Sequence, residues 1–355
     1  MSRINWARRI VVVAMIALFA AGAGTAQAAS VSQAGVLFLK ISPGARPGGM
    51  GEAFVALAND ATSTWWNPAG LAYVPYNEVT LMHSNWLPQF KFNDLYYDFV
   101  SYVHQVEDWG TFGANIIFLN LGESIRTDET GRELGTFNSY EMALTGSYGS
   151  PITNDEKMAV GVNMRFIYSN LSPVGAGSEK GTGTATSVGV DVGWLWHTPV
   201  NKLSLGANLS NMGPKVAYID RAQADPLPTN LKFGFAYHLV KSPYNTLTLV
   251  GDFDKELVYL NDDGESDPFY LALVRAWGDG AFFGTLIYHT GMEYWYSDLV
   301  GLRVGYWNDE LGKVKPITFG ASLKYSLYRF DFSYVAAGEG HPLQDTMRFS
   351  LSIGF

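Results

Sequence analysis

Charged side chains whose spacing could support binding chemistry gather toward the C-terminal end of the sequence. Glu293 and Arg303 lie in consecutive segments in which polar and apolar residues alternate, so they could pair across neighbouring strands. Later alternating segments add four more charges, and the whole group is Glu293, Arg303, Lys324, Arg329, Asp331 and Arg348. The residue types allow two interpretations, a site for a ligand or plug segment, or a charge network filling a polar interior.

The sequence offers no residue pattern typical of an enzyme or of a metal site. Nucleophilic catalysis needs a nucleophile, a base and an orienting group held together, and no motif of that kind occurs. The chain has 0 Cys, so it has neither disulfides nor thiolate metal ligands. Six histidines are scattered without metal-ligand spacing: His83, His104, His197, His238, His289 and His341. We therefore predict a non-enzymatic protein without a metal ion or cofactor.

The elements that must position the charged group are predicted to be β-strands, because segments with a period of two recur after residue 77. The last ten residues, TMRFSLSIGF, alternate without a break. We count about fourteen such segments: Asn77–Asn85, Asp94–His104, Trp109–Leu119, Phe137–Gly149, Lys157–Ser169, Thr184–Thr198, Lys202–Met212, Thr229–Leu239, Asn245–Phe253, Tyr288–Tyr296, Leu299–Asn308, Lys315–Ser326, Arg329–Ala336 and Asp345–Phe355.

The connections between these segments alternate in length. Short connections such as Pro199–Asn201 and Ser297–Asp298 alternate with long ones such as Asn120–Thr136 and Asp254–Ile287. Short periplasmic turns and long outer loops are typical of outer-membrane barrels, whereas a soluble sandwich has no reason to keep that order. The predicted fold is all-β: a transmembrane antiparallel β-barrel of about 14 strands over residues 77–355, with an N-terminal hatch or plug.

One long connection leaves the strand count open. Asp267-Pro268 can begin a short helix that continues through Ala276. The alternative for residues 268–287 is an extra pair of strands, which would give a barrel of about sixteen strands.

The first 28 residues have the features of a secretory signal peptide. Arg3, Arg8 and Arg9 precede the apolar stretch Ile10–Ala21, and Ala26-Gln27-Ala28 forms a small-residue cleavage site. The alternative is an N-terminal anchor helix. Aromatic residues make up 14% of the chain and charged residues only 16%, which suits a barrel with aromatic girdles. The net charge of -9 argues against nucleic acid as a partner.

Residues 29–76 separate this signal from the first strand and form the predicted hatch segment. Residues 44–72, GARPGGMGEAFVALANDATSTWWNPAGLA, do not alternate. Asp60 can cap one short helix and Asn67-Pro68 can start a second, so the stretch should bend between them. The residues assigned to the hatch are Gly48, Gly51, Asp60, Trp65, Trp66, Asn67, Pro68 and Gly70. A fourteen-stranded barrel is too wide for its own side chains to fill, so this segment plugs the lumen or caps it from the periplasm.

The same stretch resembles the N-terminal motif of the PorV/PorQ outer-membrane family, and its NPAGL core is similar to the hatch of FadL-type transporters. Further matches are GMEYWY at 291–296, LRVGY at 302–306, TFGASLKY at 318–325, DFSY at 331–334 and RFSL at 348–351. The resemblance covers both ends of the chain after its signal sequence. It implies a fourteen-stranded barrel with a hatch.

Two functions follow from the resemblance, and a third remains open. PorV-like members serve type IX secretion, where the partners are secreted cargo and secretion-machinery proteins. FadL-like members admit hydrophobic small molecules through the wall. The third alternative is a structural barrel without a transport role. In each case the expected location is the outer membrane of a Gram-negative-type bacterium, with membrane lipid as a partner.

Overall fold

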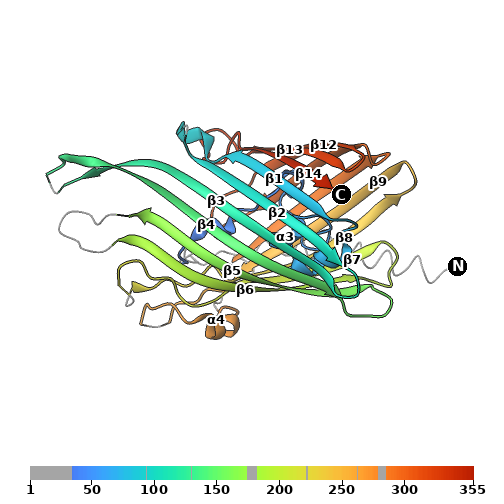
Figure 1. Cartoon of the computed structure of the whole chain (residues 1–355), viewed down its shortest axis with the longest axis horizontal. Coiled ribbons are helices and arrows are strands. Elements are labelled where there is room, and N and C mark those ends of the chain that lie inside the picture. The colour runs from blue at the N-terminus through green and yellow to red at the C-terminus, as the bar shows by residue number, and fades with distance from the viewer. Residues whose placement is uncertain are drawn as a thin grey trace.

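The computed structural model describes residues 34–92, 94–128, 130–173, 182–220, 223–261, 263–278 and 285–355. They form one closed barrel of fourteen antiparallel strands (Figure 1). The strands are β1 Glu78–Asn85, β2 Tyr96–Val106, β3 Gly110–Thr127, β4 Glu133–Pro151, β5 Met158–Ser172, β6 Gly183–His197, β7 Leu203–Met212, β8 Asn230–Lys241, β9 Asn245–Glu256, β10 Leu286–Tyr296, β11 Val300–Asn308, β12 Ile317–Tyr325, β13 Tyr328–Ala336 and β14 Met347–Gly354.

The first and last strands close the barrel. β1 pairs with β14 from Glu78 opposite Gly354 to His83 opposite Phe349, and every other strand pairs with its neighbours in sequence. The predicted fold class is confirmed. The β9–β10 connection carries the helix α4, Phe269–Arg275, and the closed barrel contains fourteen strands, so the sixteen-strand alternative is wrong.

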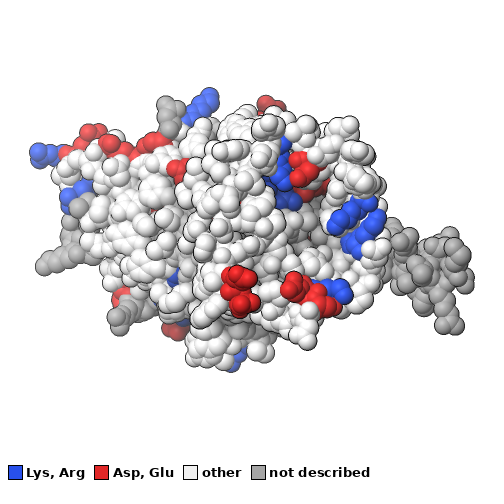
Figure 2. Space-filling view, turned by 45° about the vertical axis from the view of Figure 1, so that its right-hand side comes forward, with Lys and Arg blue, Asp and Glu red and all other residues white. Residues whose placement is uncertain are grey.

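The period of two places apolar side chains outside and polar side chains inside. On β5, Val160, Val162 and Met164 are exposed, while Asn163 and Arg165 are buried. A water-soluble sandwich would have the opposite distribution, whereas a wall that faces hydrocarbon requires this one. Figure 2 shows a broad uncharged band between charges that gather toward the two ends of the molecule.

The two ends of the barrel differ. The short turns lie at the end where β1 begins and β14 finishes, which we call the short-turn end; the opposite end is the long-loop end (Figure 1). β3 and β4 have 18 and 19 residues, whereas β1 and β14 have 8 each. A strand crosses a bilayer with about 9–11 residues. The β3–β4 hairpin therefore projects past the barrel at the long-loop end.

Before β1, the chain forms four short helical elements, η1 Leu37–Lys40, α2 Ala45–Gly48, α3 Ser63–Trp66 and η2 Pro68–Tyr73, and a fifth, η3 Pro88–Phe90, follows β1. The predicted bend at Asn67-Pro68 separates α3 from η2. The predicted signal peptide, residues 1–28, lies outside the described residues. Within the described part of the chain, every helix is too short or too polar to span a membrane.

Candidate functional site

Residues 34–76, here called the N-terminal segment, run through the inside of the barrel. Near the long-loop end, the Gly35 amide donates to the Pro226 carbonyl at 2.9 Å, and Lys40 pairs with Glu256 at the end of β9. Near the short-turn end, Gln105 on β2 donates to the Val74 carbonyl. The segment thus follows the lumen from one end to the other, and most of it is buried.

Glycines on the inner wall let the backbone of the segment approach closely. A methyl group at Gly305 would lie 2.0 Å from the Gly51 nitrogen, and one at Gly291 would lie 2.4 Å from the Met50 oxygen. The same close approach occurs at three other wall glycines, Gly161, Gly193 and Gly206. A side chain at any of these positions would displace the segment, so the wall is shaped to fit it.

Six buried charges join the segment to the wall in a closed ring, here called the ion ring: Arg46, Glu293, Arg303, Asp331, Arg329 and Asp60. Arg46 donates to both carboxylate oxygens of Glu293 at 2.9 Å, and Arg303 Nε donates to Glu293 at 2.7 Å. Arg303 Nη1 lies 3.3 Å from Asp331.

Three further contacts complete the ion ring. Arg329 donates to Asp331 at 2.8 Å and to Asp60 at 3.0 Å, and Arg46 Nη1 donates to Asp60 at 2.9 Å. Three positive charges therefore alternate with three negative charges, and each carboxylate contacts two guanidinium groups. Buried charges are costly unless they are paired and hydrogen-bonded, and the ring meets that requirement while tying α2 to β10, β11 and β13.

The sequence-predicted charge group is only partly brought together. Glu293, Arg303, Arg329 and Asp331 meet in the ion ring, whereas Arg348 forms a separate pair with Glu52 at 2.7 Å. Lys324 does not join them. Because Lys324 is next to the last residue of β12, its side chain reaches the exposed β10–β11 turn and pairs with Asp298 at 2.7 Å.

The carboxyl groups of the segment are held ionised by this arrangement. Burial raises the pKa of Asp60, but the charges of Arg329 and Arg46 outweigh it and the pKa lies below its ordinary value. Burial likewise raises the pKa of Glu52, and Arg348 and His289 bring it below its ordinary value. Protonation of either group would break a charged contact between segment and wall.

The predicted hatch residues have defined contacts inside the lumen. Asn67 is fully buried; its side chain accepts from the Ala69 amide at 3.1 Å and donates to the carbonyls of Val55 and Trp194. A methyl group at Gly70 would lie 2.2 Å from the Ala58 oxygen. Asn67 therefore caps η2 and also fixes the bend to the wall.

The remaining predicted hatch residues also lie inside the barrel. Trp66 donates from Nε1 to the Pro43 carbonyl at 3.0 Å, and the half-buried Trp65 packs against its ring. Gly51 has a φ of 63° and donates to Thr318 on β12, and Gly48 lies against Arg348. The two tryptophans therefore pack within the segment, whereas the two glycines lie against the wall.

Sequence reasoning missed Arg46, Glu52 and Asp252. The Asp252 carboxylate on β9 accepts from the amides of Phe54 and Val55 at 2.6 and 2.9 Å. Arg46 and Glu52 could have been noticed because they are charged residues inside an otherwise apolar and glycine-rich stretch. Asp252 could have been noticed as a carboxylate on the inward face of a strand.

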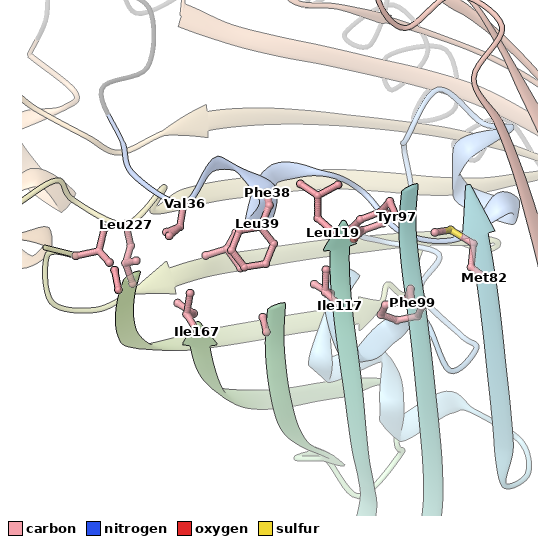
Figure 3. Packing of buried hydrophobic residues seen from close by; sticks show 13 residues of the cluster. Val36, Phe38, Leu39, Met82, Tyr97, Phe99, Ile117, Leu119, Ile167 and Leu227 are labelled. Atoms are coloured by element: carbon pink, nitrogen blue, oxygen red, sulfur yellow. The ribbon is translucent and has the colours of Figure 1, made fainter. Parts of the chain in front are cut away.

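The lumen near the long-loop end contains a buried apolar cluster, which departs from the polar interior of most barrels. Figure 3 shows Phe38 and Leu39 of η1 packed among inward side chains of the wall. The buried cluster, here called the apolar lumen cluster, comprises Val36, Phe38, Leu39, Met82, Tyr97, Phe99, Ile117, Leu119, Ala143, Ile167, Ala185, Val216 and Leu227. The N-terminal segment thus packs against apolar side chains of the wall inside the lumen.

Two small cavities lie at the short-turn end and share Leu57, Asn59 and His238. One, of about 240 Å³, is also lined by Tyr73 and His197; the other, of about 290 Å³, reaches Arg46 and Glu293. Burial, with the charges of Asp155 and Glu156, raises the pKa of Tyr73 to about 12, so its hydroxyl is neutral. Among the described residues, no three His, Asp or Glu side chains are grouped to hold a metal ion.

Solved structures with the same fold include two toluene transporters. The chain matches TodX of Pseudomonas putida with a TM-score of 0.53 and 14% identity, over 88% of this chain and 99% of TodX. It matches TbuX of Ralstonia pickettii with a TM-score of 0.53 and 13% identity, over 88% of this chain and 98% of TbuX. These likenesses concern the fold.

Sequence comparison identifies the family. A curated relative from Treponema pallidum, described as UPF0164 protein, is 30% identical over 177 residues; the match covers 45% of this chain and about half (48%) of the relative. The family model described as "Type IX secretion system protein PorV" matches residues 24–263. This protein is an outer-membrane β-barrel, and its chain belongs to the PorV family.

Proposed function

We propose that this barrel takes part in type IX protein secretion or in attachment of secreted proteins to the cell surface. In this role it binds secreted cargo and secretion-machinery proteins through its outer loops and catalyses no reaction. Membership of the PorV family supports the pathway. The observation that carries the proposed mode of action is the occupied lumen, in which the ion ring ties the N-terminal segment to three strands of the wall.

In this proposal the N-terminal segment is a hatch. It keeps the lumen closed to polypeptides, because its backbone fits against wall glycines and its charges are paired with the wall. Contact with folded partners then falls to the elements that project from the long-loop end. The β3–β4 hairpin is the longest of these elements with assigned strands (Figure 1).

Shortening that hairpin tests the proposal. Glu123 lies opposite Asn138, so residues 124–137 can be replaced by a two-residue Asn-Gly turn without shifting the register. In the native host, the gene carrying this deletion should fail to restore surface attachment of secreted proteins, although the barrel reaches the outer membrane in normal amounts. The matched control replaces only Asp128–Arg132 by the same turn, which retains most of the projecting strands. Normal attachment with the longer deletion would overturn the proposed contact.

A second candidate function is passage of hydrophobic small molecules, and the apolar lumen cluster favours it. Inward-facing apolar side chains such as Phe99, Ile117 and Ile167 would be unfavourable in a water-filled lumen. They would instead provide an apolar binding surface for a hydrophobic ligand. Toluene is a suitable probe, since the two structural neighbours are toluene transporters. Uptake of labelled toluene by cells that express this barrel, above that of cells without it, would support this candidate; equal uptake would exclude it for this probe.

A further inference from the structure

The helix α4 in the β9–β10 connection exposes an apolar stripe. Tyr270, Val274 and Trp277 recur at the spacing of one helix face, and 60%, 74% and 41% of their surfaces are exposed. Leu271 adds to the same stripe. The small residues Ala272 and Ala276 are only 2% exposed, so this side of the helix packs on the protein. An apolar stripe directed away from the protein is unusual for a helix in water.

The connection that carries α4 folds back over the outside of the barrel wall. Lys255 on β9 and Leu286 on β10 lie opposite each other in the register. Asp254, next to Lys255 on β9, and His289, three residues after Leu286 on β10, point into the lumen. Because side chains alternate along a strand, Lys255 and Leu286 face outward. Yet their exposure is only 2% and 7%, and Lys255 donates to Thr285 of the connection. The chain therefore covers the outer wall at this point.

Figure 1 shows α4 on the outer side of the barrel wall. The helix lies outside the barrel at its lower margin, level with β5 and β6 rather than beyond their ends. The exposed Phe253 is two residues from Lys255 along β9, or about 7 Å at the rise of a strand. The covered wall thus borders the lipid-facing wall directly.

The residue types in the stripe are those that membrane proteins place at the boundary between lipid headgroups and acyl chains. Trp and Tyr concentrate at that boundary, and interfacial helices bury an apolar face about 5–10 Å into it. The one charged residue of α4, Arg275, borders the stripe one helical turn after Leu271. Its side chain is about half exposed, and its charge is paired with Asp267 at 3.0 Å. The residues of the stripe itself carry no charge and continue the lipid-facing surface.

We propose that α4 lies in the outer leaflet of the membrane, with Tyr270, Leu271, Val274 and Trp277 in contact with lipid. The helix fastens the β9–β10 connection to the bilayer beside the barrel. This contact is independent of whether the barrel serves secretion or uptake.

Site-specific fluorescence tests this proposal, because the chain has 0 Cys and a single label can be introduced without background. The Val274→Cys variant carries a polarity-sensitive fluorophore in phosphatidylcholine vesicles. The Leu302→Cys variant, at a 54% exposed position on the wall of β11, is the lipid-facing control. The Leu134→Cys variant, at a 45% exposed position on the projecting β4, is the water-facing control.

A nitroxide attached to the lipid acyl chains should quench the label at position 274 as it does at position 302, and aqueous iodide should quench only the label at position 134. Quenching at position 274 by iodide alone would show that α4 stands in water and would overturn the proposal. Protection from both quenchers would show that protein covers the stripe and would overturn it as well.

Discussion

The Arg46 guanidinium in the N-terminal segment donates two hydrogen bonds of 2.9 Å to the Glu293 carboxylate on β10, across 247 residues of sequence. The same guanidinium also contacts Asp60 of its own segment. Arg46 thus joins the segment to the wall at a point where neither carboxylate is open to solvent.

Replacing Arg46 by alanine should release the segment from the wall. The Arg46→Ala substitution leaves Glu293 and Asp60 buried with one partner fewer, and breaking a buried pair costs about 3–5 kcal/mol. Urea unfolding in lipid vesicles measures the loss. Lys40→Ala is the matched control in the same segment, because the Lys40–Glu256 pair is partly exposed and should contribute about 0–1 kcal/mol. Equal losses in the two variants would contradict this role of the ion ring.

Two glycines on the inner face of β6 provide a test of the fit between segment and wall. A methyl group at Gly193 would lie 2.3 Å from the Asn67 side chain, so Gly193→Ala should cost about 1–3 kcal/mol through overpacking. Gly189→Ala places a methyl group 3.8 Å from its nearest neighbours and should be tolerated. The readout is the rate at which a maleimide modifies a cysteine introduced by Ser42→Cys. Faster modification is expected only with Gly193→Ala; the same rate in both backgrounds would argue against a close fit.

Acid should loosen the segment. The pKa values of Asp60 and Glu52 are lower in the folded protein than in the unfolded chain, so their ionised forms stabilise the fold above about pH 4–5. This contribution is lost as the pH falls through the folded pKa values. Modification of the Ser42→Cys variant by a thiol reagent active in acid should therefore accelerate below about pH 4. In the Asp60→Asn variant the acceleration should be smaller; an unchanged pH profile would contradict the assignment.

The Phe38 side chain should contribute strongly to the packing of the apolar lumen cluster, and so to the stability of the protein. Phe38→Ala removes a side chain that is 2% exposed and should cost about 3–5 kcal/mol in unfolding free energy. The neighbouring Leu37→Ala removes a side chain that is 48% exposed and should have little effect. The space left by Phe38→Ala is lined by apolar groups and should take up toluene, which a toluene-dependent rise in the stability of this variant alone would reveal. No rise would show that the wall collapses into the space.

The sequence by itself determined the strands and their faces. Alternation is a local property, so each predicted segment overlaps one strand of the barrel, and the length of the connections distinguished a membrane barrel from a sandwich. The helix in the β9–β10 connection and the bend at Asn67-Pro68 were also predictable, because proline restricts its own backbone and that of the preceding residue.

Only the tertiary structure decided the partners of the inward side chains. Alternation shows that Glu293 and Lys324 face inward, but not that Glu293 meets Arg46 whereas Lys324 turns to Asp298. It also did not show that Phe38 fills an apolar part of the lumen. The physical reason is that a period of two specifies a direction from the strand, while contacts inside a closed barrel depend on how a non-repeating segment passes through it.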